Sequence, residues 1–354
     1  MPTKIDTFTK SNSMNLKAQT YLVRLFFLSL ISFASAQEMP NSLRVKSNQL
    51  VKAPYLKKGD TIAIVAPAGI LMNREASIEK AKRLVESWGL HVVLGEHLYV
   101  QGSHFAGSDE ERAADFQKAL DNKNIKAIWS ARGGYGSVRI LDLLDFSTFK
   151  KHPKWIVGYS DITAIHSHVH NLGFETLHAM MATSLEEDPK ETKKTIASFK
   201  SALFGESLSY QVSPNDLNRK GSAEGQLVGG NLTMLLTMLG SKSEIDTRGK
   251  ILFIEEIGEY KYHIDRMLQS LKRAGYFENC KGLIIGDMTK IKKNTTPWGE
   301  SIESLILEVV AEYDFPVLFD FPAGHEADNQ AIILGRTIEM DVTEQHATVL
   351  FMQN

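Results

Sequence analysis

The chain has 354 residues, of which 43% are hydrophobic and 23% are charged, the balance of a globular protein long enough for two domains. Its formal net charge of -2 gives no general attraction to nucleic acid or to an anionic membrane, so we expect a small-molecule or peptide partner. The single cysteine, Cys280, excludes a disulfide within the chain and a cysteine-rich metal cluster.

The N-terminus has the features of a secretory signal peptide. Basic residues precede the apolar run LFFLSLISFASA, and Ala34 and Ala36 form an A-x-A cleavage pattern. The run is shorter than the roughly 20 residues that a membrane-spanning helix needs. We therefore predict a signal peptide over residues 1–36, cleavage after Ala36, no stable membrane insertion afterwards, and a periplasmic or secreted protein. A buried N-terminal helix in a cytoplasmic protein is the alternative, and the true start is Met1 or Met14.

Short apolar runs alternate with amphipathic segments from about residue 55 onward. Ser108 and Glu111 have the spacing of a capping box, which predicts that a helix begins there. Repeated alternation of strands and helices predicts a parallel sheet covered on both faces, with ligands at the carboxyl ends of the strands. The expected strands of this half are 61–67, 91–95, 125–131 and 155–159, and the expected helices are 76–89, 108–120 and a segment after 160.

A polar stretch with clustered Pro, Asn, Asp and Gly predicts a loop or linker over residues 186–223. We therefore expect an α/β protein with an N-terminal domain over residues 50–185 and a second α/β domain over residues 224–354. The later half contains an expected helix at 262–275 and expected strands at 250–258, 281–288, 316–321, 331–342 and 347–352.

The tetrapeptide GYSD at residues 158–161 follows an apolar run and precedes a helical pattern. A serine at such a junction can expose its Oγ on a tight turn, where the backbone N–H of Asp161 would stabilise a developing oxyanion. The alternative is that Ser160 only caps the helix, because serine is a favoured N-cap residue and the tetrapeptide lacks the second glycine of the usual nucleophile-elbow motif. The tetrapeptide alone leaves both interpretations open.

A second motif, RGGYGS, starts at Arg132 and follows another expected strand. Its adjacent glycines let the backbone approach a ligand closely, and Gly134 could supply a second oxyanion N–H. The spacing does not match a dinucleotide-binding fingerprint. A tight strand-to-helix connection without a ligand is the alternative.

Two glutamates and a histidine complete the set of candidates. Glu255 and Glu256 end an otherwise apolar run, and strand alternation points them to opposite faces, so only one of them can orient a base. They could also be two solvated charges at a strand end. His325 lies in the loop sequence AGHEADN, from which a histidine can reach another part of the fold, although a lone histidine is more often structural.

His166 and His170 lie four residues apart on one expected helix, which is a metal-ligand spacing. The H-E-x-x-H arrangement is absent, and no cysteine lies nearby. We therefore expect no metal site here.

Taken together, RGGYGS, GYSDITAIH, GGNLTMLLTMLG, FIEEIGEYKYHIDRML and GHE resemble the LD-carboxypeptidase family of serine peptidases, which includes the microcin-immunity hydrolases. The resemblance runs from about residue 54 to the C-terminus. It implies an N-terminal α/β domain similar to class I glutamine amidotransferases, and a smaller C-terminal domain with a β-barrel-like sheet. It also implies an active site between the two domains and a homodimer.

By resemblance, Ser160 is the nucleophile, His325 is the general base and Glu255 orients the imidazole. The backbone N–H groups of Asp161 and Gly134 are the oxyanion-hole candidates. The implied reaction releases terminal D-alanine from a murein tetrapeptide and needs no metal or organic cofactor.

Arg132 and Asn231 are candidate contacts for the terminal carboxylate of that substrate. Two features depart from the family pattern: the export signal, and the sequence His178-Ala179-Met180 where many relatives have HGP. An immunity-type hydrolase of aminoacyl-nucleotide toxins and a non-catalytic muropeptide-binding protein remain as alternatives. An aromatic pocket for a nucleobase would favour the immunity-type enzyme.

Overall fold

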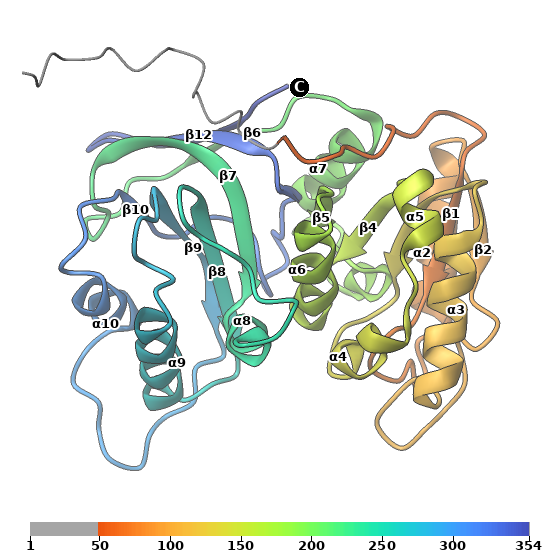
Figure 1. The fold of residues 1–354 in the computed structure, drawn as a ribbon, viewed down its shortest axis with the longest axis horizontal. Helices are drawn as coiled ribbons and strands as arrows, with labels where there is room; N and C mark the ends of the chain where they lie inside the picture. Colours follow the sequence, from red (N-terminus) through yellow and green to blue (C-terminus); the bar gives the residue numbers. More distant parts are fainter. Residues whose placement is uncertain (1–48, 354) are drawn as a thin grey trace, which may run out of the picture. The chain divides into compact units, whose positions relative to one another are not determined.

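The computed structural model describes residues 49–353. The predicted signal peptide and both candidate start residues lie outside this range. Within it, no helix combines the length and the apolar character that crossing a bilayer requires. The described part of the chain forms two β-sheets with flanking helices, which confirms the α/β fold class expected from the sequence (Figure 1).

The first sheet has the strand order β11-β5-β4-β3-β1-β2, and all neighbouring pairs are parallel except β11 with β5. Its strands are β1 (Thr61–Val65), β2 (His91–Leu94), β3 (Ile125–Ser130), β4 (Trp155–Gly158), β5 (Thr176–His178) and β11 (Ile332–Leu334). The helices of this half are α2 (Glu75–Ser87), α3 (Asp109–Asp121), α4 (Ser137–Ile140), η2 (Leu141–Leu143), α5 (Ser147–Lys151), η3 (Ser160–Ile162), α6 (Thr163–Asn171) and η4 (Ala182–Glu186).

The capping box predicted at the start of α3 is confirmed. The backbone N–H of Glu111 donates to Ser108 Oγ at 3.2 Å, and the N–H of Ser108 donates to Glu111 Oε2 at 2.8 Å. The two side chains thus satisfy backbone donors that the first turn of the helix cannot pair internally.

The second sheet has the order β10-β9-β8-β7-β12-β13-β6, with parallel pairing from β7 to β10 and antiparallel pairing from β7 to β6. Its strands are β6 (Ser209–Val212), β7 (Gly221–Asn231), β8 (Ile251–Ile257), β9 (Gly282–Thr289), β10 (Val317–Leu318), β12 (Thr337–Val342) and β13 (Ala347–Phe351). The remaining helices are α7 (Lys193–Phe204), α8 (Leu232–Met238), α9 (Lys261–Arg273) and α10 (Ile302–Val309), and Figure 1 shows α9 and α10 beside β8 and β9.

One cluster of buried side chains runs through both sheets. It includes Trp129 of β3 and Trp155 of β4 as well as Phe253 of β8 and Ile284 of β9. A second cluster fills the space between β8, β9 and the helices α8, α9 and α10. Strands β4 and β8 are buried on both faces, which explains their continuous apolar sequences.

The structure differs from the expected linker over residues 186–223, because this stretch contains α7 and β6. Helix α7 forms because Ile196, Phe199 and Leu203 recur at helical spacing and pack against the shared core. The polar residues that follow α7 dominate the composition of residues 186–223, so the helical spacing of its apolar residues was not recognised in the sequence.

The expected strand at 331–342 is divided between the two sheets. β11 pairs with β5 of the first sheet, and β12 pairs with β7 of the second. Between them, Gly335 has a φ of +90°, a conformation that favours glycine. The buried guanidinium of Arg336 then donates from Nε to Glu175 Oε1 at 2.8 Å. A strand and a buried ion pair thus join the two halves of the fold.

Candidate active site

Ser160 lies directly after β4, in a backbone conformation that serine rarely adopts. Its φ is +61°, in the left-handed region that costs a non-glycine residue of the order of 1–3 kcal/mol. The helix-cap interpretation is wrong, because the N-cap of α6 is Ile162 and no side chain caps the preceding turn. Within residues 49–353, Ser160 Oγ makes no hydrogen bond, so the hydroxyl is held by the turn rather than by a partner.

The RGGYGS loop packs directly against this turn. A Cβ on Gly133 would lie 3.2 Å from Ser160 Cβ and 3.4 Å from Ser160 Oγ, so only glycine leaves the serine undisturbed. The backbone N–H of Ser137 donates to Asp161 Oδ2 at 2.7 Å. Burial raises the pKa of Asp161, and the hydrogen bonds from Ser137 partly offset this effect. The side chain of Asp161 therefore links the GYSD turn to the RGGYGS loop.

Glu255 and His325 are joined by a short hydrogen bond. His325 Nδ1 lies 2.6 Å from Glu255 Oε2, and the side chains are 12% and 0% exposed. Burial alone would lower the pKa of His325, but the charge and hydrogen bond of Glu255, with the charges of Glu256 and Asp287, hold it above its usual value. This hydrogen bond occupies Nδ1 and fixes the orientation of the ring, so Nε2 is the ring nitrogen that is left to exchange a proton.

Glu256 serves the opposite face of β8, as strand alternation predicts. Its Oε2 accepts from the backbone N–H of Thr233 at 2.8 Å, and its Oε1 accepts from Asn231 Nδ2 at 3.2 Å. Asn231 also caps α8, because its side chain accepts from the N–H of Met234. Burial raises the pKa of Glu256, although Thr233 partly counters that rise. The pair Glu256–Asn231 is thus built into the start of α8.

Tyr159 brings the Ser160 turn next to the Glu255–His325 pair, and His178 packs against Tyr159. The ring of Tyr159, the residue before Ser160, packs edge-on against His325 with 5.0 Å between centroids. His178 lies 5.9 Å from Tyr159 and is wholly buried, and neither ring nitrogen is hydrogen-bonded to a described residue. Burial, with His166 and His325 nearby, lowers the pKa of His178 well below its usual value. His178, which matches the first residue of the HGP pattern, is therefore a neutral imidazole, and the departure from that pattern lies at Ala179 and Met180.

Asp287, which we did not single out from the sequence, holds the His325 loop. Its Oδ2 accepts from the backbone N–H of Glu326 at 2.8 Å, and its own N–H donates to Ala323 at 3.0 Å. A Cβ on Gly324 would lie 2.8 Å from Asp287 Cβ, so the loop fits closely around this side chain. Burial, with the charges of Glu255 and Glu326, raises the pKa of Asp287 to about 6 against the opposing hydrogen bond.

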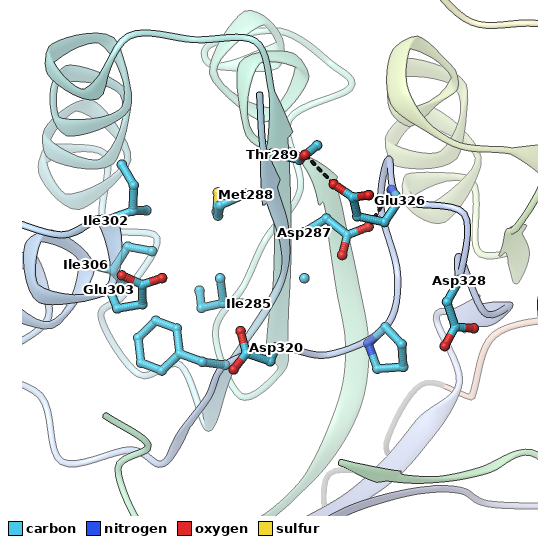
Figure 2. A pocket seen from close by; sticks show the side chains of 13 residues that line it. Ile285, Asp287, Met288, Thr289, Ile302, Glu303, Ile306, Asp320, Glu326 and Asp328 are labelled. Carbon is cyan, nitrogen blue, oxygen red and sulfur yellow. Dashed lines mark hydrogen bonds between the residues drawn. The ribbon is translucent and has the colours of Figure 1, made fainter. Parts of the chain in front are cut away.

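Asp287 also faces a cavity of about 340 Å³. Figure 2 shows its carboxylate beside that of Glu326, which accepts a hydrogen bond from Thr289, while Glu303 lies on the far wall. A smaller cavity of about 170 Å³ borders His325 itself and is lined in part by Arg74, Tyr159 and Asn329. Space for a ligand therefore exists on both sides of the His325 loop.

The remaining candidates are placed as follows. Arg132 donates from Nη1 to the carbonyl of Ile70 at 2.6 Å, and burial lowers its pKa. His166 Nε2 bonds to the carbonyl of Gly158 at 2.9 Å, and burial lowers the pKa of His170 to about 4. No group of three or more side chains that could hold a metal ion occurs among the described residues.

Comparison with known proteins identifies the family. Residues 62–179 match the N-terminal domain of LD-carboxypeptidases, and residues 224–340 match their C-terminal domain. The chain therefore belongs to the LD-carboxypeptidase family, which makes it a carboxypeptidase and so a hydrolase.

Similar proteins agree with this assignment. A probable murein peptide carboxypeptidase of Bacillus subtilis is 37% identical over 84% of this chain and 94% of its own length. The structure of muramoyltetrapeptide carboxypeptidase from Oxalobacter formigenes has a TM-score of 0.75 at 27% identity, covering 83% of this chain and 99% of that one. The microcin C7 self-immunity protein MccF, solved with aspartyl sulfamoyl adenosine, has a TM-score of 0.76 over 86% and 99% of the two chains. At 23% identity, that likeness concerns the fold alone.

Proposed function

We propose that the protein is a serine-type LD-carboxypeptidase that releases the terminal D-alanine of murein tetrapeptides. The hydrogen bond of 2.6 Å between Glu255 and His325 is the observation that carries the proposal. It supplies an oriented base next to Tyr159, and the following residue is a serine on a strained turn. The names of the relatives, murein peptide and muramoyltetrapeptide carboxypeptidase, support the choice of substrate.

In the proposed mechanism, Ser160 Oγ attacks the carbonyl carbon of the scissile amide while His325 Nε2 takes its proton. His325 then gives this proton to the leaving amine of D-alanine, and an ester with Ser160 remains. Water, activated by the same imidazole, hydrolyses the ester. Glu255 holds the ring through Nδ1 and stabilises its charged form. The proposal requires a hydrogen bond between Ser160 Oγ and His325 Nε2 in the substrate complex, where catalytic hydrogen bonds often tighten.

The oxyanion of each tetrahedral intermediate is assigned to the backbone N–H groups of Asp161 and Gly134. Neither group donates to another backbone or side-chain acceptor within the described residues, so both are available to a substrate oxygen. Gly134 has a φ of +101°, which favours glycine and turns this segment of the loop sharply. Donors fixed by the backbone need no reorganisation when charge develops.

Asp287 is proposed as a positioning residue for His325. It makes no hydrogen bond to Ser160 or His325 among the described residues, but it binds the backbone on both sides of His325. Its negative charge also favours the protonated imidazole.

Arg132 and Asn231 are the proposed contacts of the terminal carboxylate. One guanidinium nitrogen of Arg132 is occupied by Ile70, which leaves other N–H groups for a ligand. Asn231 has one amide hydrogen beyond its bond to Glu256. We further propose that the protein is exported with Gln37 as its first residue and forms a homodimer, which N-terminal sequencing and sedimentation of the mature protein would test.

Product analysis tests the proposed reaction. Residues 37–354 are incubated with tri-, tetra- and pentapeptide stems, and the products are identified by mass. We expect the tetrapeptide to lose one alanine while the tripeptide stays intact. An unchanged tetrapeptide would refute the proposal, and cleavage of an aminoacyl adenylate analogue instead would assign the immunity-type activity.

A further inference from the structure

A buried guanidinium lies against the RGGYGS loop, and the proposed mechanism has not used it. Arg112, on α3, is 1% exposed, and its Nη1 donates to the carbonyl of Pro67 at 2.5 Å and to that of Gly136 at 3.0 Å. Its Nη2 pairs with Asp109, and its guanidinium carbon lies 4.9 Å from the centre of the Phe105 ring. Burying a charge costs free energy that a core methionine or leucine would avoid, so this arginine indicates a requirement beyond packing.

The two carbonyls belong to separate loops. Pro67 follows β1, and Gly136 ends the run of glycines in the RGGYGS loop. The two loops also meet directly, because the backbone N–H of Gly69 donates to the carbonyl of Gly133 at 3.0 Å. A Cβ on Gly136 would lie 2.8 Å from Arg112 Nη1. The glycine at this position therefore lets the guanidinium reach the loop.

Arg112 and Asp161 bind opposite ends of one peptide group. The carbonyl of Gly136 accepts from Arg112. The N–H of the same peptide belongs to Ser137 and donates to Asp161 Oδ2 at 2.7 Å. A cation at the oxygen and an anion at the N–H both favour this orientation of the peptide dipole, and hydrogen bonds to charged groups are roughly twice as strong as neutral ones. The Gly136–Ser137 peptide is therefore held from both sides.

Charge couples the two residues across this peptide. Burial raises the pKa of Asp161, and the charge of Arg112 opposes that rise. Burial in turn lowers the pKa of Arg112, whereas the charges of Asp109 and Asp161 raise it. Each charge favours the other, so loss of the guanidinium would also weaken the hold that Asp161 has on the loop.

The Gly136–Ser137 peptide is close in sequence to the groups that are proposed to react. Asp161 follows Ser160 directly, and Gly134 lies two residues before Gly136. Gly134 and Gly136 have φ values of +101° and +138°, which favour glycine. Because glycine has the greatest backbone freedom, a loop of glycines needs fixed contacts to hold an N–H within the small tolerance of catalysis. The buried guanidinium supplies such a contact.

We propose that Arg112 is a positioning residue for the reaction: by binding the carbonyl of Gly136, it fixes the RGGYGS loop so that the N–H of Gly134 meets the oxyanion. This inference rests on the proposed function and adds to it a residue that acts through the loop. An arginine that only stabilised the fold would change the thermal midpoint and leave kcat of the folded protein unaltered.

The test measures kcat and KM for D-alanine release from murein tetrapeptide, together with the thermal midpoint. We expect kcat of Arg112→Met to fall about a hundredfold at unchanged KM, the loss that follows from a displaced oxyanion donor. Arg112→Lys keeps a cation whose three N–H donors can serve both carbonyls, so it should restore most of kcat although it loses the fork geometry toward Asp109.

Arg139→Gln is the matched control. The guanidinium of Arg139 also pairs with Asp109, at 2.7 Å, and lies 5.1 Å from the centre of the Phe105 ring. Its side chain makes no hydrogen bond to the Gly136–Ser137 peptide in the described part of the chain, and the substitution keeps its backbone N–H. This variant should retain wild-type kcat.

Wild-type kcat in folded Arg112→Met would overturn the inference and leave the proposed function intact. So would an equal loss of kcat in Arg112→Lys, or the same loss in Arg139→Gln, because the pair with Asp109 would then be the group that matters. If Arg112→Met does not fold, Arg112→Gln takes its place, since its shorter, neutral side chain loses the contact with Gly136, and unchanged kcat there overturns the inference equally. Wild-type protein that releases no D-alanine would refute the proposed function itself, and this inference with it.

Discussion

Replacing Gly133 by alanine should impair catalysis without impairing the fold. The new Cβ would lie 3.2 Å from Ser160 Cβ and 3.4 Å from Oγ, whereas unstrained carbon atoms pack at about 3.5–4.0 Å. Relief of that contact moves the serine by about 0.5 Å. Since misplacement by about 1 Å can cost a hundredfold in rate, we expect kcat to fall by about tenfold, with little change in KM. Gly133 needs no positive φ, so the substitution adds no backbone strain.

Steady-state release of D-alanine from the free tetrapeptide measures this effect, and thermal unfolding checks the fold. Gly225→Ala in β7 is the matched control, because its Cβ would meet atoms of Gly249, Lys281 and Ile251 at 3.2, 3.4 and 3.5 Å, and none of Ser160. It should retain wild-type kcat. Wild-type kcat in Gly133→Ala, or an equal loss in Gly225→Ala, would refute the claim that the glycine loop sets the position of the nucleophile.

Three further predictions concern the histidine and its neighbours. Glu255→Gln leaves the buried imidazole of His325 without its anionic partner. Because breaking such a pair costs about 3–5 kcal/mol, kcat/KM should fall by at least about a hundredfold. A smaller loss would exclude Glu255 from the mechanism. Since His325 must be neutral to act as a base and its pKa is raised, kcat/KM should fall as the pH decreases through a value above 6.5, whereas a flat profile there would contradict the assignment. Asp287→Asn keeps an acceptor for the backbone N–H of Glu326 but removes a negative charge that favours protonated His325. The fall of kcat/KM at acidic pH, the acidic limb of the profile, should therefore move to lower pH. Glu303→Gln, on the far wall of the same cavity, is the control and should leave the acidic limb in place. An unmoved limb in Asp287→Asn would exclude the electrostatic role of Asp287.

The charged and titratable groups near His325 determine how it titrates, and Glu256 acts on it by charge alone from the opposite face of β8. Glu255 and Glu256 come from β8, Asp287 from β9 and neutral His178 from β5. Glu326 adjoins His325 within its own loop and pairs with Thr289. Because the charges of Glu255, Glu256 and Asp287 favour the protonated imidazole, the pKa of His325 is raised despite its burial.

The sequence reveals the candidate site where a polar residue ends an apolar strand. Ser160 and Glu255 stand out for this reason, because β4 and β8 are buried on both faces and tolerate few polar residues. Asp287 ends the apolar run of β9 in the same way, and this signal could have found it. What the pattern cannot give is the partner: that Asp287 binds the backbone of Glu326, 39 residues later, depends on tertiary packing.

Long-range pairing set the limits of prediction for the fold as well. The strands and helices that were expected in the first half follow the local periodicity, and Ser108 and Glu111 cap α3 as expected, whereas the short elements β5 and α5 were not expected. The short strand β11 has no local feature that assigns it to one sheet or the other, and it joins β5 rather than the second sheet. The choice between cap and nucleophile at Ser160 was also open in the sequence, because a serine before a helix suits both roles. It depends on a backbone angle, which the residue types do not reveal.

The central claim is that the hydroxyl of Ser160 carries out the peptide cleavage. The most direct measurement is the release of D-alanine from murein tetrapeptide by Ser160→Ala, beside wild-type protein and with the thermal midpoint of both recorded. The account predicts that the folded variant releases no D-alanine above the uncatalysed background. Sustained turnover by that variant would contradict it.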